Sequence, residues 1–329
     1  MGPLLDELHN QFFTRPPVPT ADFSGKTIIV TGANVGLGKE AVKHFVKLHA
    51  AKVIIAVRST SKGEAAKAEI ERDSKVATNV IDVWPLDYSN YASCKQFAAK
   101  VATLDRVDAV VLNAGITTEK FELFEDNESQ VTVNVISTVL LALLVLPALR
   151  TSAANNRGTT PIISIVGSGV HAYTKFPERK EPGILAACND PKKARMSDRY
   201  QVTKLMSLFA VRSMAEKTAN AKPYVIINTV NPGLCYTDLT RSLTGSTGNA
   251  MKVMRAAMAW SAEEGSRTLV HATTVGPESH GVFISGSKIP NNGQSKFVTS
   301  PEGISTQKKL WAEISEKLEK IQPGITTEL

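Results

Sequence analysis

The stretch TIIVTGANVGLG at residues 27–38 decides the fold of this 329-residue chain. Its first five residues predict a buried β-strand, because they are β-branched and apolar without interruption. A glycine-rich turn follows, and the next residues repeat at helical spacing in the amphipathic pattern Ala41, Val42, Phe45, Val46 and His49. Strand, glycine turn and helix in this order predict the opening βα unit of a parallel sheet.

Short β-branched runs alternate with helical segments through the rest of the chain. Seven runs predict strands, and each gap between them is long enough for a crossover helix: 27–31, 53–57, 80–86, 109–112, 161–166, 224–230 and 282–285. One uninterrupted series of this kind indicates one domain. We therefore expect an α/β fold, a single-domain Rossmann-type doubly wound parallel sheet of about seven strands with helices on both faces.

Three segments depart from the βα rhythm. Residues 1–24 contain a proline-rich run and predict an extended arm ahead of the domain at 25–329. Residues 172–198 predict a surface insertion near the end of the fifth strand, where it could form a lid. Residues 236–260 predict a substrate-loop region with an apolar wall, or alternatively a core-facing helix, from Leu239, Leu243, Met251, Val253, Met254, Met258 and Trp260.

Composition excludes several classes of protein. The net charge of +7 comes from 38 Lys and Arg against 31 Asp and Glu, and the basic residues are scattered. The densest basic cluster, 192–195, has no interleaved aromatic residue, which favours a solvated loop over a nucleic-acid surface. The 3 cysteines form no CxxC pair and the histidines lack ligand spacing, so we expect no metal and a reducing, cytoplasmic location.

No segment predicts a secretory signal or a transmembrane span. The first twenty residues include Asp6, Glu7, His9 and Asn10, so no apolar signal core exists there. In the most membrane-like stretch, 131–149, polar residues interrupt the sequence and the uninterrupted apolar run 139–149 covers only 11 residues. That length favours a buried helix.

The glycine turn predicts a dinucleotide site. Glycines let the backbone approach a pyrophosphate, whose negative charge then lies against free N–H groups at the positive end of the helix. The alternative is a tight turn that binds nothing, but the strand before it and the helix after it both favour the binding site. We expect contacts to the dinucleotide from Thr31, Gly32, Asn34, Gly36, Leu37 and Gly38.

The position that distinguishes NAD from NADP carries a cation. About 20 residues past the last glycine, NAD sites place an Asp or Glu that binds the ribose hydroxyls. Here that residue is Arg58, followed by Ser59 and Lys62. Cations and a hydroxyl favour the 2′-phosphate of NADP(H), which an acid would repel. The alternative for Arg58 is a solvent-facing residue at a strand end.

Four further motifs follow predicted strands at their carboxyl ends, the edge where open α/β sheets bind ligands. They are Asn113-Ala114-Gly115, Ser168, the helix opening Tyr200-Gln201-Val202-Thr203-Lys204, and Asn231-Pro232-Gly233 with Thr237. Tyr200 and Lys204 are four residues apart and share one helix face. A nearby ammonium lowers the pKa of a phenol, so Tyr200 is a candidate acid or base for a ketone or alcohol oxygen.

Together with the glycine turn, these motifs resemble the short-chain dehydrogenase/reductase family from Lys26 to about Ile289. The resemblance implies that Tyr200, Lys204, Ser168 and Asn134 are catalytic, with Ser168 bonding the substrate oxygen and Asn134 holding a water beside the lysine. It also implies cofactor contacts from Asp87 at the adenine, from Thr237 at the carboxamide, and from Asn113, Ala114, Gly115, Pro232 and Gly233. From the residues alone, Asn134 could instead bond only to backbone, and Asp87 could cap the next helix.

Departures from the family pattern concern the substrate and the cofactor. Tyr200 follows Ser168 by 32 residues, longer than the usual interval by about the length of the insertion. Val35 stands where NADP-binding relatives often have a basic residue. The long interval, the arm and a late helix around Trp311 resemble the subgroup of retinol-dehydrogenase-like and fungal secondary-metabolite reductases.

The sequence thus predicts an NADPH-dependent oxidoreductase that acts on a ketone or secondary alcohol of a lipophilic small molecule, with fungal secondary metabolism as its setting. An epimerase or dehydratase of a sister branch is one alternative, but its glycines are spaced three and three, whereas here they are spaced four and two. A catalytically silent NADP-binding scaffold is another. Self-association stays open, because the helices that carry Asn134 and Tyr200 often pair between subunits in relatives.

Overall fold

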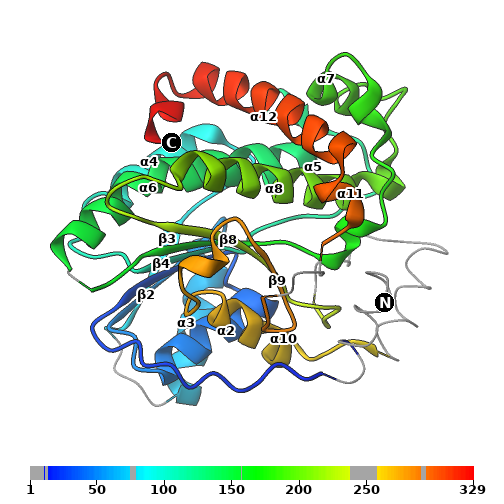
Figure 1. The fold of residues 1–329 in the computed structure, drawn as a ribbon. Coiled ribbons are helices and arrows are strands. Elements are labelled where there is room, and N and C mark those ends of the chain that lie inside the picture. The colour runs from blue at the N-terminus through cyan, green and yellow to red at the C-terminus, as the bar shows by residue number, and fades with distance from the viewer. Residues whose placement is uncertain (1–10, 12–13, 75–78, 157, 238–257, 290–293) are drawn as a thin grey trace.

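The computed structural model describes residues 11, 14–74, 79–156, 158–237, 258–289 and 294–329 (Figure 1). Its main sheet has seven strands in the order β3-β2-β1-β4-β7-β8-β9, and every neighbouring pair is parallel. The strands are β1 (Thr27–Thr31), β2 (Lys52–Val57), β3 (Ile81–Pro85), β4 (Ala109–Leu112), β7 (Ile162–Val166), β8 (Ile226–Asn231) and β9 (Phe283–Ser285). The predicted doubly wound parallel sheet is confirmed.

Strand β1 lies at the centre of the sheet. Ile28 is paired with Val53 of β2 on one side and with Ala109 of β4 on the other. The chain order reverses between β1 and β4, and in sheets of this kind the ligand crevice opens at that point, outside the carboxyl ends of the strands. The glycine turn therefore begins at the switch point of the sheet.

Helices cover both faces of the sheet (Figure 1). One face packs against α2 (Gly36–Lys47), α3 (Thr60–Ser74) and α10 (Ala262–His271), and the other against α4 (Tyr91–Val101), α6 (Ser137–Asn155) and α8 (Met196–Thr218). Alternate residues of β1 divide between the two cores: Ile28 and Val30 face the first, and Ile29 the second. Burial on both faces explains the uninterrupted apolar strands in the sequence.

Helix α2 ends earlier than the sequence pattern predicts. Its buried face includes Ala41, Val42, Phe45 and Val46, but the helix stops at Lys47. His49 lies beyond it, exposed, in a left-handed conformation with φ of 68°. The assignment of His49 to this helix was therefore wrong, because the chain turns there to enter β2.

The long apolar segment lies inside the protein. Residues Ser129–Asn155, which comprise α5 (Ser129–Val131), the π-helical turn η1 (Thr132–Ile136) and α6, have the length and hydropathy of a membrane span, yet 83% of their most apolar window is buried. Each strand face needs an apolar partner, and α6 supplies it. The segment is thus built as a core helix, as predicted.

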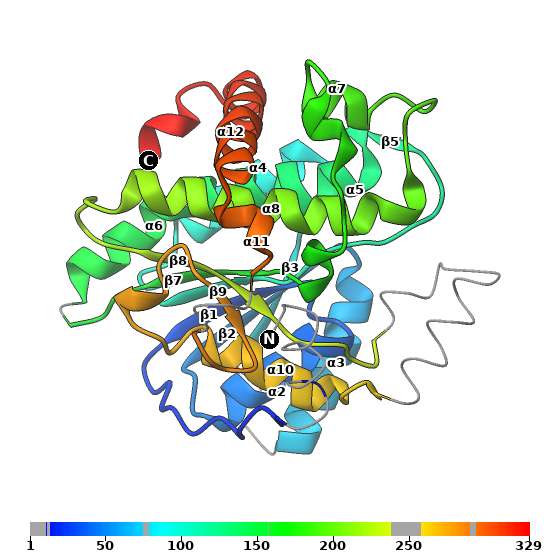
Figure 2. The same cartoon turned by 45° about the vertical axis from the view of Figure 1, so that its right-hand side comes forward.

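The insertion is not a simple surface loop. It follows η2 (Gly169–Ala172) and contains η3 (Pro177–Lys180) and α7 (Ile184–Cys188), and both Phe176 and Cys188 are fully buried. The carboxylate of Glu313 on α12 (Pro301–Ile321) accepts hydrogen bonds from the backbone N–H groups of Ile184 and Leu185, each at 2.8 Å. Figure 2 shows α7 and α12 on the same side of the sheet. The expectation of a surface insertion was wrong, because Phe176 and Cys188 are buried and the start of α7 bonds to α12.

Helix α12 also covers α8. Gln307 accepts a hydrogen bond from Arg212 Nε at 2.9 Å and donates one to Glu216 at 3.0 Å. The part of α8 that carries Arg212 and Glu216 therefore packs against α12. The remaining short elements are the hairpin β5 (Leu123–Phe124) and β6 (Asn127–Glu128), which the sequence did not predict, with η5 (Pro277–Ser279), α11 (Lys296–Thr299) and η6 (Ile325–Glu328).

Two predicted segments are described only in part. The arm has no helix or strand over residues 14–24, whereas Gln11 is helical and Phe23 is buried in the core. Of the predicted apolar wall, only Met258 and Trp260 lie within the described residues, and Trp260 is 3% exposed. Trp260 is thus a packed core residue, whereas the others lie outside the described residues: Leu239, Leu243, Met251, Val253 and Met254.

Candidate active site

The turn after β1 requires glycine at three positions. Gly32 and Gly38 have no room for a side chain, and Gly32 and Gly36 adopt a backbone conformation that disfavours other residues. Gly32 and Gly36 have positive φ, of 65° and 58°. A Cβ at Gly32 would lie 2.9 Å from the Cα of Ala114, and one at Gly38 would lie 2.6 Å from Asn113 Nδ2. The turn is therefore packed against the end of β4, as a phosphate-binding turn requires.

The N-terminus of α2 has the features of an anion site. Val35 precedes the helix, provides no side-chain cap, and no acidic residue follows in the first turn. The backbone N–H groups of this turn therefore keep their capacity for an anionic ligand. Thr237, in the loop after β8, lies against this turn, since a Cβ at Gly36 would lie 3.6 Å from its methyl group. These features fit the pyrophosphate of a dinucleotide.

Asn113 joins the ends of β1 and β4. Its Nδ2 donates hydrogen bonds to the carbonyls of Thr31 at 2.9 Å and Gly32 at 3.3 Å. The Thr31 hydroxyl in turn accepts from the backbone N–H groups of Asn113 and Ala114, both at 3.0 Å, and from the Tyr88 hydroxyl at 3.2 Å. The shape of the glycine turn thus depends on a side chain from the next motif.

The end of β2 presents exposed cations. Arg58 and Lys62 are exposed, and no hydrogen bond or ion pair within the described residues engages the Arg58 guanidinium. Between them, the Ser59 hydroxyl lies 3.0 Å from that of Ser61, and α3 has no acid in its first turn. This group combines positive charge, hydroxyls and a helix N-terminus.

Asp87 is not a helix cap. Asn90 caps α4 by accepting a hydrogen bond from the Ser93 N–H at 2.9 Å. The Asp87 carboxylate instead accepts from the backbone N–H and the hydroxyl of Ser89, at 2.9 and 2.7 Å. The capping alternative was therefore wrong, and Asp87 is half-buried at the carboxyl end of β3.

Lys204 is a buried ammonium that pairs with no carboxylate of the described residues. Its Nζ donates a hydrogen bond to the carbonyl of Val166, the last residue of β7, at 2.7 Å. Its Nζ also lies 5.6 Å from the centre of the Tyr200 ring. Because burial disfavours the charged form, the pKa of Lys204 falls to about 8. Lys204 therefore changes charge near neutral pH.

Tyr200 keeps its proton in the protein alone. Burial raises the pKa of its phenol above the ordinary value. The sequence argument expected the opposite direction from the adjacent lysine, and that expectation was wrong for the chain without a ligand, because desolvation dominates. A protonated phenol beside an ammonium is the arrangement that donates a proton to a substrate oxygen.

Ser168 follows β7 by two residues and begins η2. Its carbonyl accepts a hydrogen bond from His171 Nδ1 at 2.8 Å, while His171 Nε2 accepts one from the Ser295 N–H at 3.1 Å. His171 is therefore the neutral Nδ1–H tautomer, and burial lowers its pKa in agreement. Asn231 Oδ1, from β8, accepts from the Gly169 N–H at 3.1 Å. Sequence reasoning assigned His171 no role, because this contact joins residues far apart in the chain.

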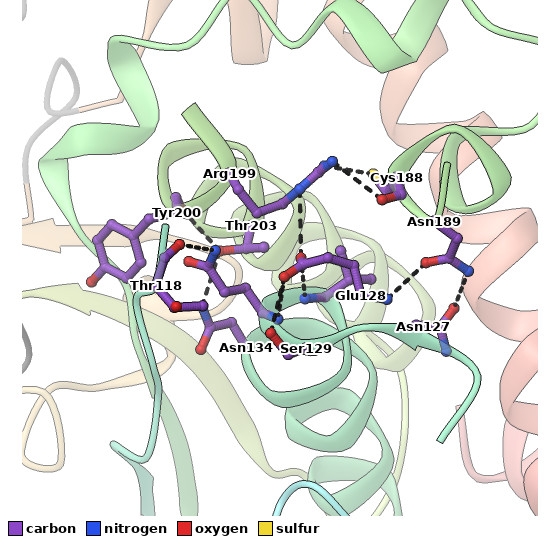
Figure 3. Close-up of polar contacts among 12 residues, drawn as sticks. Thr118, Asn127, Glu128, Ser129, Asn134, Cys188, Asn189, Arg199, Tyr200 and Thr203 are labelled. Carbon is purple, nitrogen blue, oxygen red and sulfur yellow. Dashed lines mark hydrogen bonds and ion pairs between the residues drawn. The ribbon is translucent and has the colours of Figure 1, made fainter. Parts of the chain in front are cut away.

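Asn134 lies in the π-helical turn η1 and joins two segments (Figure 3). Its Oδ1 accepts from the Ile116 N–H at 2.9 Å, and its Nδ2 donates to the Ile116 carbonyl at 2.9 Å and to the Thr203 hydroxyl at 3.1 Å. Its partners are therefore not only backbone, as the alternative supposed. Asn134 connects the loop after β4 to the residue before Lys204.

A buried ion cluster lies beside these residues (Figure 3). Arg199, fully buried, pairs with Glu178 at 3.1 Å and Glu128 at 3.5 Å, and donates to the Cys188 Sγ at 2.9 Å and its carbonyl at 3.3 Å. Glu128 also accepts from the N–H groups of Gln130 and Val131 at the start of α5. Arg199 thus joins the insertion to the helices that carry Asn134 and Tyr200.

The predicted residues gather along one edge of the sheet. The glycine turn follows β1, Arg58 follows β2, Asn113 follows β4, Ser168 follows β7 and Pro232 follows β8. Among the described residues, no group of three or more His, Cys, Asp or Glu lies close enough to hold a metal. The site therefore combines a dinucleotide turn with a tyrosine–lysine pair.

This fold and site define a dinucleotide-dependent oxidoreductase. A family model for short chain dehydrogenases matches residues 26–174. A short chain dehydrogenase/reductase of Cryptosporiopsis sp. is 46% identical, over 97% of this chain and 98% of the relative. A short-chain dehydrogenase of Penicillium roqueforti is 41% identical, over 98% of this chain and 84% of the relative. The chain belongs to the short-chain dehydrogenase/reductase family, as the motifs indicated.

Solved structures share the fold at low identity. The RhlG/NADP active-site complex of Pseudomonas aeruginosa has a TM-score of 0.60 at 17% identity and covers 84% of this chain and 98% of its own. A 3-ketoacyl-(acyl-carrier-protein) reductase of Brucella melitensis, complexed with NADH, has a TM-score of 0.57 at 21% identity and covers 80% and 97%. One neighbour holds NADP and the other NADH, so the family implies a nicotinamide cofactor without choosing between them.

We expect the substitution Arg199→Met to destabilise the protein strongly, because it leaves Glu128 and Glu178 as buried carboxylates without their cation. Breaking a buried pair in this way costs about 3–5 kcal/mol. Urea unfolding followed by tryptophan fluorescence measures the loss. Adding Glu128→Gln and Glu178→Gln to Arg199→Met should restore part of the stability.

Lys320→Met serves as the matched control, because Lys320 pairs with Glu316 on the surface, with both side chains 70% exposed. The control should unfold at nearly the wild-type urea concentration. Equal stability of Arg199→Met and the wild type would contradict the structural role of the cluster.

Proposed function

We propose that this protein is an NADPH-dependent reductase, reversible in principle, that acts on a ketone or secondary alcohol of a lipophilic small molecule. One observation carries the proposal. The half-buried Tyr200 and the buried Lys204 lie together at the carboxyl edge of the sheet, where the bond from Lys204 to Val166 fixes the lysine. The chemistry that this pair supports is proton transfer to or from an oxygen atom.

The side chains divide the work of reduction. When bound, the nicotinamide supplies or accepts the hydride. Tyr200, protonated because burial raises its pKa, donates its proton to the ketone oxygen. The Ser168 hydroxyl donates a hydrogen bond to the same oxygen, and the Lys204 ammonium stabilises the phenolate left on Tyr200. Alcohol oxidation uses the same groups in reverse.

The proposal of NADP over NAD rests on the end of β2. A 2′-phosphate there meets the exposed Arg58 and Lys62, the Ser59 hydroxyl and the N-terminus of α3, and no acid in the first turn of that helix. A charge-assisted bond from Arg58 would favour the phosphate form. NAD has a hydroxyl in place of the 2′-phosphate, so it has no negative charge at this position for these cations to bind.

The substrate class and the setting are part of the same proposal. The apolar composition of residues 236–260 supports a lipophilic substrate. Relatives from Cryptosporiopsis and Penicillium roqueforti support a role in fungal secondary metabolism. We place the protein in the cytoplasm, because Cys94 and Cys188 are buried thiols outside any disulfide.

We expect Tyr200→Phe to lower kcat by about 10²- to 10⁴-fold, the usual contribution of general acid catalysis. Its affinity for NADPH should stay close to that of the wild type, because the lost hydroxyl acts on the substrate. NADPH oxidation with a panel of ketones, read as absorbance loss, measures kcat, and fluorescence titration measures affinity.

Tyr224→Phe is the matched control, because Tyr224 precedes β8 at the opposite end of the strand, and it should keep full activity. Undiminished turnover by Tyr200→Phe would exclude Tyr200 as the acid. NADPH binding by the wild type without turnover of any carbonyl would favour the scaffold alternative.

Arg58→Asp should raise the Kd for NADPH by about 10- to 100-fold, the loss expected for a hydrogen bond between charged groups. The Kd for NADH should fall or stay constant, because an acid at this position suits the ribose hydroxyls. Isothermal titration with both cofactors gives the ratio. Arg72→Asp makes the same charge change at the end of α3 and should leave the ratio unchanged; an equal effect of both variants would refute the assignment of Arg58.

The rate of ketone reduction should decline above about pH 8. The pKa of Lys204 is lowered from 10.5 to about 8, so the ammonium is present below pH 8 and lost as the pH rises through that value. Steady-state kcat at saturating NADPH between pH 6 and 10 measures this. Arginine stays protonated throughout, so in Lys204→Arg any remaining activity should lose the decline near pH 8. A decline that persists there would assign it to another group.

A further inference from the structure

The N-terminal arm reaches the loop after β8 through one buried side chain, Gln11. Its Oε1 accepts a hydrogen bond from the Leu234 N–H at 2.9 Å. Its Nε2 donates to the carbonyl of Leu234 at 3.0 Å and to that of Met258 at 2.7 Å. Its own carbonyl accepts from the Trp260 indole N–H at 3.0 Å. Gln11 is 8% exposed, so these bonds form away from solvent.

These bonds join two segments that lie far apart in sequence. The Trp260 N–H donates to the Leu234 carbonyl at 2.9 Å, and the Tyr236 N–H donates to the Trp260 carbonyl at 2.9 Å. Residues 234–236 and 258–260 are thus paired through backbone hydrogen bonds, and Gln11 bonds to both segments. We call this unit, together with Gln11, the Gln11 clasp.

The clasp borders the dinucleotide turn. Gly233 directly follows Pro232 and has a φ of 76°. Its N–H donates a hydrogen bond to Asn231 Oδ1 at 3.1 Å. A Cβ at Gly233 would lie 2.8 Å from the Trp260 ring and 2.9 Å from Gln11 Oε1, so the clasp packs directly on Gly233. Four residues after Gly233, Thr237 lies against Gly36 of the glycine turn. The arm therefore contacts the loop that faces the helix N-terminus.

A second set of contacts fixes the arm next to the clasp. Arg15 pairs with Glu264 on α10, and Arg267 of the same helix donates to the carbonyl of Pro16 at 2.9 Å. Helix α10 also packs on α2 through Leu37, which would meet a Cβ at Gly265 at 2.8 Å. Both the arm and the glycine turn therefore contact α10.

We propose that Gln11 is a positioning residue for the nicotinamide half of the dinucleotide, acting through the loop at residues 232–237. The inference rests on the proposed function only in that the chain binds a nicotinamide dinucleotide at the glycine turn. Glutamine suits the position because one amide supplies both the acceptor for Leu234 N–H and the donor for two carbonyls. A domain that begins at β1 would lack this contact.

Binding measurements on the full-length protein test the proposal. Gln11→Met keeps the length of the side chain and removes its hydrogen bonds. We expect it to raise the Kd for NADPH about tenfold, and Gln11→Glu to raise it further, because a carboxylate oxygen would then face the carbonyls of Leu234 and Met258. The Kd for 2′-phospho-ADP-ribose, which lacks the nicotinamide, should stay within about twofold of the wild-type value.

The control is Val18→Ala, which shortens a side chain of the same arm that is 62% exposed and should leave both Kd values unchanged. An unchanged NADPH affinity in Gln11→Met, or equal losses for NADPH and for 2′-phospho-ADP-ribose, would overturn the proposal. If Gln11→Met fails to fold by circular dichroism, Trp260→Phe decides. It removes the indole donor to the Gln11 carbonyl, together with the part of the ring that packs on Gly233, and should raise the NADPH Kd about threefold. An unchanged Kd would overturn the inference.

The failure of this inference differs from that of the proposed function. A wild-type protein that binds NADPH, with Gln11 variants that bind it equally well, would refute the role of Gln11 alone. A Tyr200→Phe variant with full turnover would refute the catalytic proposal and leave the binding result standing. A wild-type protein that binds neither NADPH nor NADH would refute both.

Discussion

Parallel strands that end at one edge leave backbone groups there that no further strand can satisfy, and this constraint organises the site. Side chains meet the need at the ends of β1 and β7: Asn113 bonds the carbonyl of Thr31, and Lys204 bonds that of Val166, while Asn231 bonds the N–H of Gly169 just after β7. Each of these side chains comes from another element. The same bonds that complete the sheet therefore set the glycine turn, the lysine and the serine loop relative to one another.

Charge buried behind this edge is arranged in two different ways. Lys204 has a carbonyl but no carboxylate, so its ammonium is held at a lowered pKa and is available for chemistry. Arg199, five positions before it, is paired with Glu128 and Glu178 and joins three segments. Neighbouring cations on one helix thus serve opposite purposes: Lys204 remains reactive because it is poorly neutralised, and Arg199 is structural because two carboxylates pair with it.

The sequence predicts most of the fold because its signals are local. Strand β1, the glycine turn and α2 follow from adjacent residues, and parallel topology then brings Ser168, Tyr200 and Asn113 to one edge without further information. What it does not predict depends on distant pairs. His171 with Ser295, Arg199 with Glu128, and Gln11 with Met258 leave no pattern in a single sequence. The direction of the Tyr200 pKa was missed for the same reason, because burial is a property of the folded chain.

The parts outside the common sheet act on the site through backbone contacts. The insertion is anchored by Glu313 to α12 and by Arg199 to α8, while the arm is anchored by Gln11 and Arg15 to the loop after β8 and to α10. These anchors lie on opposite sides of the ligand edge: one set supports the helix with Tyr200, and the other the loop with Thr237. Glu313 and Gln11 bond backbone groups, whereas Arg199 and Arg15 pair with carboxylates, so polar side chains hold the added segments against α8, α10, α12 and the loop at residues 232–237.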